Sequence, residues 1–281
     1  MFPAKIGFLF FFVMICFDVR TENLSFNRAF LFESGQKADY IEIEKENLST
    51  TAPEGRSAVW NFHFLETDGQ VNVFNYKSAD ETDYQDQVPD FNIGEFREDG
   101  TAMLFYQNKQ HSFMKGLVEP ERGIVIQFDE MIPLYSRPLK YSDSTGGKGK
   151  RSFSYAGIGF SGEGSSYSVV DGQGKLILPE DTFDNVLRIK TVQDFEDSGP
   201  LGMRVKSYIE SYSWLIEDLP FPVLSIDSLY REDPFSSATE IKLRILKDYD
   251  SNPSGSQMNS LPETPGEKNP IQSGFRSFLR E

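Results

Sequence analysis

Apolar and polar residues alternate in short segments along the chain. In residues 57–66, SAVWNFHFLE, the alternate positions Ala58, Trp60, Phe62 and Phe64 are all apolar. Successive side chains of a β-strand point to opposite faces, so these four are expected to face a core. The segment therefore predicts a strand with one buried face.

Asp68 and Gly69 follow this segment and lead into a second apolar run, residues 71–76. An Asp-Gly pair suits a tight turn, so the two runs predict a β-hairpin. Further runs recur about every ten residues with turn residues between them, a spacing typical of β-sandwiches and barrels. These runs are residues 101–107, 123–128, 152–160, 186–192, 221–230 and 240–246.

The whole pattern favours an all-β fold. The chain has 25 Phe and 12 Tyr, scattered singly as aromatic residues are when they fill the space between sheets. Only residues 200–216 fit a helical period about as well as an alternating one. We predict an antiparallel β-sandwich, or a jelly-roll-like domain, over residues 50–247, with residues 21–49 as a peripheral N-terminal segment.

The N-terminus has the features of an export signal. Lys5 precedes about a dozen apolar residues, too few to span a bilayer, which takes about 20. We predict that residues 1–20 are a signal peptide, that the mature chain has no transmembrane span, and that the protein is exported to the periplasm, the cell surface or the exterior. Cys16 permits an alternative, lipoprotein anchoring. Ile15 precedes it where a small residue is required, so the plain signal peptide is favoured.

The C-terminal residues 248–281 differ in composition from the rest of the chain. They are rich in Ser, Pro, Gly and Asn and poor in apolar residues. Such a segment cannot bury enough surface to offset the entropy lost on ordering. We predict a disordered tail.

The stretch Asp171-Gly172-Gln173-Gly174 raises the question of a phosphate-binding glycine loop. Such a loop must follow a strand and open a helix, because the helix N-terminus holds the phosphates. Here the next residues are KLIL and Pro179, a strand signature. We predict instead a hairpin turn in which Gly172 supplies a positive φ.

The same region carries a resemblance. The motifs GQGKLILP at 172–179, NVLRIK at 185–190, YIESYSW at 208–214 and FPVLSI at 221–226 resemble those of a family of uncharacterised secreted proteins of Bacteroidetes. The resemblance covers residues 60–227. It implies export from the cytoplasm of a Gram-negative bacterium and a β-sandwich, and it implies no known activity. Lys175 departs from the family pattern, in which threonine is usual.

Charge excludes one class of partner. With 43 acidic and 28 basic residues the net charge is −15, and such a surface repels phosphate backbones. The one basic cluster, residues 148–151, is short, and we interpret it as a solvated loop. No nucleic-acid partner is predicted.

Neither histidine nor cysteine forms a catalytic or zinc motif. His63 and His111 are the only histidines, and neither has ligand or nucleophile spacing. If the signal peptide is removed after Cys16, the mature chain has no thiol. No catalytic residues and no cofactor are predicted, with calcium as the one alternative.

The calcium alternative rests on an acidic segment that contains Asp80, Asp83 and Asp86. Oxygen-rich loops can hold Ca²⁺, which takes about 6 to 8 oxygen ligands. The spacing does not match the EF-hand loop, so a solvated acidic loop is the competing interpretation.

Three aromatic residues are candidates for ligand binding. Tyr208, Tyr212 and Trp214 share one parity of a predicted strand, and planar rings of this kind stack on sugars. The same parity also fits a buried aromatic layer of the core, which is the favoured interpretation.

The function predicted from these features is an exported, non-catalytic binding or surface-structural module. Its ligand is unknown, and the partner classes considered are a polysaccharide and an envelope protein. The alternatives are a carbohydrate-active hydrolase, which needs two carboxylates about 5 to 10 Å apart, and a plain structural component of the cell envelope. The sequence leaves the oligomeric state open.

Overall fold

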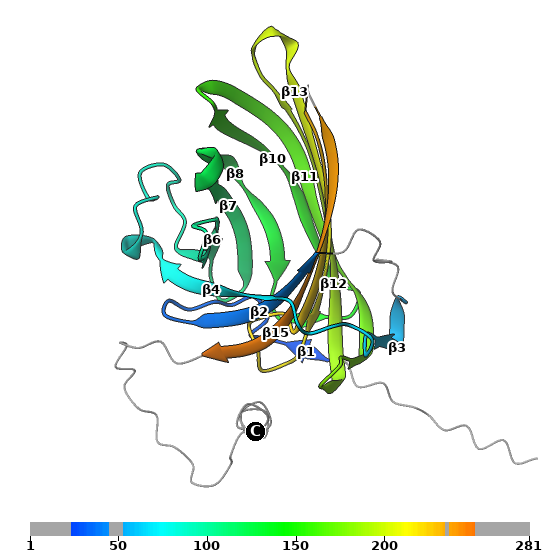
Figure 1. Ribbon diagram of the computed structural model, residues 1–281. Coiled ribbons are helices and arrows are strands. Elements are labelled where there is room, and N and C mark those ends of the chain that lie inside the picture. The colour runs from blue at the N-terminus through cyan, green and yellow to red at the C-terminus, as the bar shows by residue number, and fades with distance from the viewer. Residues whose placement is uncertain (1–23, 45–52, 234–235, 251–281) are drawn as a thin grey trace, which may run out of the picture.

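The computed structural model describes residues 24–44, 53–233 and 236–250, and these form an all-β protein (Figure 1). Its helices are three single turns of 3-10 helix, η1 (Ala79–Glu81), η2 (Pro120–Arg122) and η3 (Pro200–Gly202). Within those described ranges, no helix is long and apolar enough to cross a membrane. The strands are β1 (Ser25–Phe26), β2 (Lys37–Glu44), β3 (Gly55–Asn61), β4 (Gln70–Ser78), β5 (Ile93–Arg97), β6 (Ala102–Gln107), β7 (His111–Glu119), β8 (Ile124–Ser136), β9 (Leu139–Lys140), β10 (Ser144–Tyr155), β11 (Ile158–Ile177), β12 (Thr182–Ser198), β13 (Arg204–Leu215), β14 (Leu224–Glu232) and β15 (Ser237–Asp250).

Twelve of the strands form one closed antiparallel barrel. The chain runs as a meander from β4 through β5, β6, β7, β8 and β10 to β15, each strand pairing with the next. β2 then lies between β15 and β4, pairs with both, and closes the ring. β3 pairs in parallel with the part of β11 that β10 does not reach, so it is not one of the twelve.

The predicted sandwich is therefore wrong, although the all-β class is confirmed. Alternating strands look alike in a sandwich and in a barrel, and the two differ in whether the edges of the sheet meet. Here the strand that joins the edges is β2. It comes from residues 21–49, which were predicted to be peripheral, so that prediction is wrong as well.

The predicted ends of the chain fall largely outside the described residues. The signal peptide, residues 1–20, and most of the tail, residues 248–281, are among them. The described part of the tail, residues 248–250, belongs to strand β15.

One end of the barrel is closed by two segments, residues 24–36 and 216–223. They meet where the Phe30 N–H donates to the Pro220 carbonyl at 2.9 Å. Phe32 in the first segment is 7% exposed and stacks on the ring of Tyr76. These segments form a plug between the strands.

Arg137 anchors the plug to the wall. Its guanidinium donates to the Phe30 carbonyl (3.0 Å), to Ser112 Oγ (2.8 Å) and to the His111 carbonyl (2.8 Å). Burial lowers the pKa of Arg137 to about 10. The side chain thus ties together three segments that are distant in sequence.

A second segment, residues 53–69, crosses the outside of the barrel from β3 to β4, and we call it the strap (Figure 1). The ring of Phe62 packs edge-on against Trp214, with centroids 5.4 Å apart, and Trp60 does so at 6.1 Å. At the far end of the strap, Gly69 lies against Ile41 of β2. The strap therefore covers the outer face of the barrel between β12 and β2.

A third segment, residues 79–92, covers another part of the outer face. Its Val88 and Phe91 are buried against Phe96 and Val118, which belong to β5 and β7. This small apolar cluster is separate from the main core, so the segment is held by contacts of its own.

Away from these two segments, strand β12 shows how the two faces of the wall differ. Its Asp194 and Glu196 are exposed outside, whereas Gln193, Phe195 and Asp197 are buried inside. The basic cluster at 148–151 lies in strand β10 rather than in the predicted loop.

Two predicted turns are wrong. β3 and β4 do not pair, so Asp68-Gly69 is part of the strap rather than a hairpin turn. β11 continues through Asp171-Gly172, with one register shift between Val170 and Gly172 and another between Gly174 and Leu176. Gly172 serves close packing instead, because a Cβ there would lie 2.5 Å from the ring of Trp60.

Candidate functional site

The interior of the barrel contains a cavity of about 220 Å³. Its floor is the plug, through Phe30, Phe32 and Pro222. Water takes about 30 Å³ in the liquid, so the space holds about seven waters or a molecule of about ten non-hydrogen atoms. This is the volume of a small molecule rather than of a polymer.

One wall of the cavity is apolar. It is formed by inward side chains of neighbouring strands β6, β7 and β8, whose alternation directs them inside. Aromatic rings also surround the space, and Phe30 and Tyr135 are stacked with centroids 3.9 Å apart. The wall residues are Met103, Phe105, Met114 and Leu134, and the rings belong to Phe30, Phe32, Tyr40, Phe105 and Tyr135.

The opposite wall is polar. Strands β12 to β14 turn hydroxyl and amide side chains into the cavity. The small hydroxyl side chains leave the space that the cavity occupies. These residues are Thr191, Gln193, Ser211, Ser213 and Ser225.

Two arginines reach the cavity beside Phe74. The guanidinium of Arg97 lies 5.0 Å and that of Arg244 5.6 Å from the centre of the Phe74 ring. Arg244 is hydrogen-bonded to Asp227 through Nη2. Burial would lower the pKa of Arg244, but the charge of Asp227 outweighs it and raises that pKa, so Arg244 stays charged.

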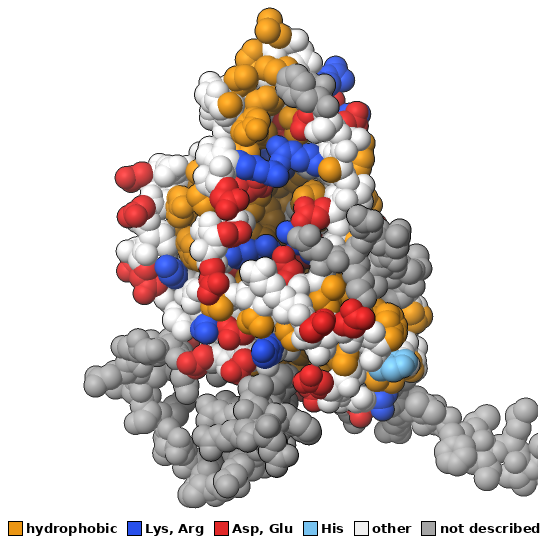
Figure 2. Space-filling view, viewed as in Figure 1, with side chains coloured by type: hydrophobic (Ala, Val, Ile, Leu, Met, Phe, Trp, Pro, Cys, Tyr) orange, Lys and Arg blue, Asp and Glu red, His pale blue; other side chains and the backbone are white. Residues whose placement is uncertain are grey.

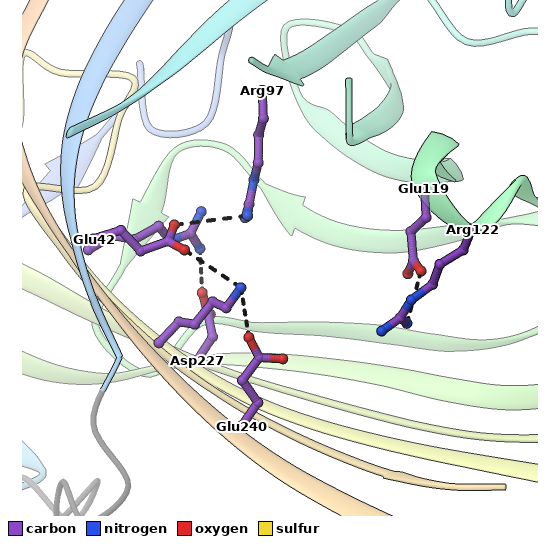
Figure 3. A network of polar contacts seen from close by, with 8 residues as sticks. Glu42, Arg97, Glu119, Arg122, Asp227 and Glu240 are labelled. Atoms are coloured by element: carbon purple, nitrogen blue, oxygen red, sulfur yellow. Dashed lines mark hydrogen bonds and ion pairs between the residues drawn. The ribbon is translucent and has the colours of Figure 1, made fainter. Parts of the chain in front are cut away.

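The Arg244–Asp227 pair lies beside a network of further charged residues (Figure 3). Glu42 Oε2 lies 3.9 Å from Arg97 Nη1, and its Oε1 lies 3.6 Å from Lys242 Nζ. Lys242 also pairs with Glu240 at 2.7 Å. The four residues Glu42, Arg97, Lys242 and Glu240 thus carry two charges of each sign.

Glu95 lines the cavity next to this network, but its partner is a neutral hydroxyl rather than a cation. The Tyr76 hydroxyl donates to Glu95 Oε2 at 2.9 Å. Among the described residues, no lysine or arginine forms an ion pair with Glu95. Of the two carboxylates that line the cavity, Asp227 is thus paired with a cation and Glu95 is held by a neutral hydroxyl.

The tyrosines around the cavity remain neutral. Burial raises the pKa of Tyr135 to about 12, and it also raises the pKa of Tyr40. Burial and then the charge of Glu95 raise the pKa of Tyr76. Their hydroxyls therefore serve as hydrogen-bond donors, as Tyr40 does to the Pro222 carbonyl at 3.0 Å.

Figure 2 shows the molecule hollowed on the face turned to the viewer, with hydrophobic side chains inside and side chains of both charges at the edge. This agrees with the composition of the cavity, whose walls combine apolar residues with arginine and carboxylate groups. The cavity is therefore amphipathic.

The three aromatic residues singled out in the sequence lie outside the barrel. Trp214 is completely buried beneath the strap, Tyr212 is 5% exposed, and Tyr208 is 39% exposed. The hydroxyls of Tyr208 and Tyr212 donate to Glu210, at 3.2 and 2.5 Å. Burial would raise the pKa of Glu210, but these bonds and Lys190 outweigh it and lower that pKa. Only Tyr208 of the three presents its ring to solvent.

The acidic candidates Asp80, Asp83 and Asp86 lie in the segment that covers β5 to β8. Across the part of the chain that the structure describes, no three His, Cys, Asp or Glu side chains gather as a metal site would require. The structure therefore gives no support to calcium binding at these residues.

Sequence reasoning missed the residues of the cavity. Glu95 stands in GEFR and Arg244 in KLRIL, where a charge between apolar residues reads as a solvated position. Within a closed barrel the same position points to the interior. These charged positions can therefore be recognised as interior only once the sheet is known to close into a barrel.

Comparisons with protein-family models, with curated proteins and with solved structures found no match to this chain. The resemblance to secreted Bacteroidetes proteins stays a prediction. We therefore infer function from the geometry of the cavity.

Proposed function

We propose that the protein is an exported, non-catalytic binding module that holds a small molecule inside its barrel. The observation that carries the proposal is the amphipathic cavity of about 220 Å³ above a closed floor. Binding sites are typically concave and mostly apolar, with a few polar groups that orient the ligand. The cavity has these properties, and export rests on the apolar N-terminal run.

The volume narrows the class of ligand. A polysaccharide chain does not fit a space for about ten non-hydrogen atoms, so the ligand is a small molecule or one end of a larger one. Hydrolysis is disfavoured because the two carboxylates that line the cavity are Glu95 and Asp227, and Asp227 is held by Arg244. A binding role needs no free pair of carboxylates, so it is compatible with the ion pair between Asp227 and Arg244.

The proposal is tested by filling the cavity. Ser211→Phe places a ring in the space from the polar wall, whereas Ser165→Phe places one on the exposed outer face of β11. Ligand-observed NMR with a mixture of phenyl-bearing fragments of about ten non-hydrogen atoms is the measurement.

We expect fragments to bind the wild-type protein and the Ser165→Phe variant and to lose binding to the Ser211→Phe variant. Thermal melts of all three proteins check that each is folded. Fragment binding that survives in a folded Ser211→Phe variant would show that the site is elsewhere.

A further inference from the structure

The charges of the cavity favour a ligand of one sign, provided that the barrel interior is the binding site as proposed above. Arg244 forms its ion pair with Asp227, and the charge of Glu95 acts on it at longer range. Arg97 and Lys242 are balanced by Glu42 and Glu240. Glu95 remains, a carboxylate that accepts one hydrogen bond from a neutral tyrosine and faces the cavity.

The surroundings of Glu95 are aromatic. Rings of Phe30, Phe32, Phe105 and Tyr135 line the same space. The face of an aromatic ring is negative, so a cation within about 6 Å of the ring centre is attracted to it. Groups of rings with a nearby carboxylate are therefore suited to an ammonium group.

The alternative is an anionic ligand bound by Arg97, which has only a 3.9 Å ion pair within the described part of the network. The four charged side chains that line the cavity, Glu95, Arg97, Asp227 and Arg244, carry two charges of each sign. An added anion would compete with Glu42 and Asp227 for the two arginines, whereas an added cation would give Glu95 an ion pair that it does not have among the described residues. The whole chain, at −15, also attracts cations to the molecule.

We propose that the cavity binds a small organic cation, an amine with an apolar body, whose ammonium group lies against Glu95 and the aromatic rings. The apolar body lies along the wall of Met103, Met114 and Leu134. Tyr76 holds the Glu95 carboxylate in place through its hydroxyl. The pocket thus selects ligands by the charge of the head group and by the size of the apolar body.

The experiment compares three probes that share a phenyl body and differ in head group: 2-phenylethylamine, 2-phenylethanol and 3-phenylpropanoate. Affinities for the purified protein are measured by calorimetry or ligand-observed NMR. The variants are Glu95→Gln, which keeps an acceptor for Tyr76, and the control Glu163→Gln, which removes an exposed carboxylate from the outer face of β11.

We expect the amine to bind about tenfold or more tightly than the alcohol, and the carboxylate to bind least. Glu95→Gln should remove about tenfold of the amine's affinity and leave that of the alcohol within about twofold, while Glu163→Gln changes neither. If Glu95→Gln fails to fold, the ranking of the three probes by their affinity for the wild-type protein still tests the amine proposal.

Equal or tighter binding of the alcohol or the carboxylate would overturn the amine proposal and leave the cavity as a binding site. The amine proposal would be overturned in the same way if a folded Glu95→Gln variant binds the amine as wild type does. Absence of binding by all three probes would count against the amine proposal, and if the fragment mixture also fails to bind, against the proposed function too.

Discussion

Two buried arginine–aspartate pairs stand out at the scale of single residues. Inside the barrel, Arg151 Nε and Nη2 donate to the two carboxylate oxygens of Asp197 at 2.9 and 2.5 Å. Outside it, Arg188 donates in the same way to Asp171 and lies over the rings of Tyr212 and Trp214. A buried pair contributes little net stability, but one partner left alone is costly.

The Arg151–Asp197 pair gives a prediction. Asp197→Asn leaves the buried guanidinium of Arg151 without its counter-charge, so we expect a loss of about 3 kcal/mol of unfolding free energy. The double variant Arg151→Met, Asp197→Asn removes both charges and should recover most of that loss. Urea unfolding of the wild type, both single variants and the double variant measures the coupling. Additive losses would show that the pair is not coupled.

At the scale of elements, the strap is an unusual part of the fold. It covers apolar side chains that the barrel turns outwards, such as Trp214, Leu243 and Ile245. The two tryptophans of the chain, Trp60 and Trp214, both lie at this contact. Tryptophan fluorescence therefore reports directly on whether the strap is docked.

Phe62→Ala tests the docking. Phe62 is 7% exposed and packs on Trp214, so its truncation should cost about 3 kcal/mol and shift tryptophan emission to the red. The control is Phe64→Ala, on the same segment, because Phe64 is 58% exposed and should change stability by about 0.5 kcal/mol or less. Thermal unfolding and emission spectra are the measurements. Equal effects of the two variants would contradict docking through Phe62.

The same elements show what sequence could predict. Alternation predicted a strand over 57–66, of which β3 covers only 57–61. It predicted the burial of Ala58, Trp60 and Phe62 correctly, but Phe64 is exposed. The partner of this strand could not be found, because β3 pairs in parallel with residues 172–177, far along the chain. Local turn signals carry no information on such pairing.

The candidate site was out of reach for a related reason. In KLRIL, the apolar Leu243 and Ile245 are buried beneath the strap, whereas Arg244 lines the cavity and Lys242 pairs with Glu42 and Glu240. Alternation gives two faces of a strand but assumes that the apolar face is the inner one. The strap reverses that assignment, and Glu95 and Asp227 come together with Arg244 only through the register of distant strands.

At the scale of the whole molecule, the ring of strands is uneven. β11 pairs with β12 along almost its entire length, from Ser161 to Ile177. β10 pairs with β8 through only two residue pairs, Arg151 with Phe128 and Ser152 with Gln127. Regions with few backbone hydrogen bonds open first, so this junction, which we call the seam, is expected to be the least stable part of the barrel.

Hydrogen exchange and a disulfide test the seam. In a Cys16→Ser background, Gln127→Cys with Ser152→Cys introduces a pair in register across it, and paired residues of antiparallel strands lie about 4.5 to 5.5 Å apart, within the reach of a disulfide. We expect the disulfide to form in air and to slow amide exchange in β8 and β10. The control pair Ser165→Cys, Asp194→Cys joins β11 to β12 and should leave exchange at the seam unchanged. Seam amides that are already as protected as those of β11 and β12 before cross-linking would show that the ring has no weak junction.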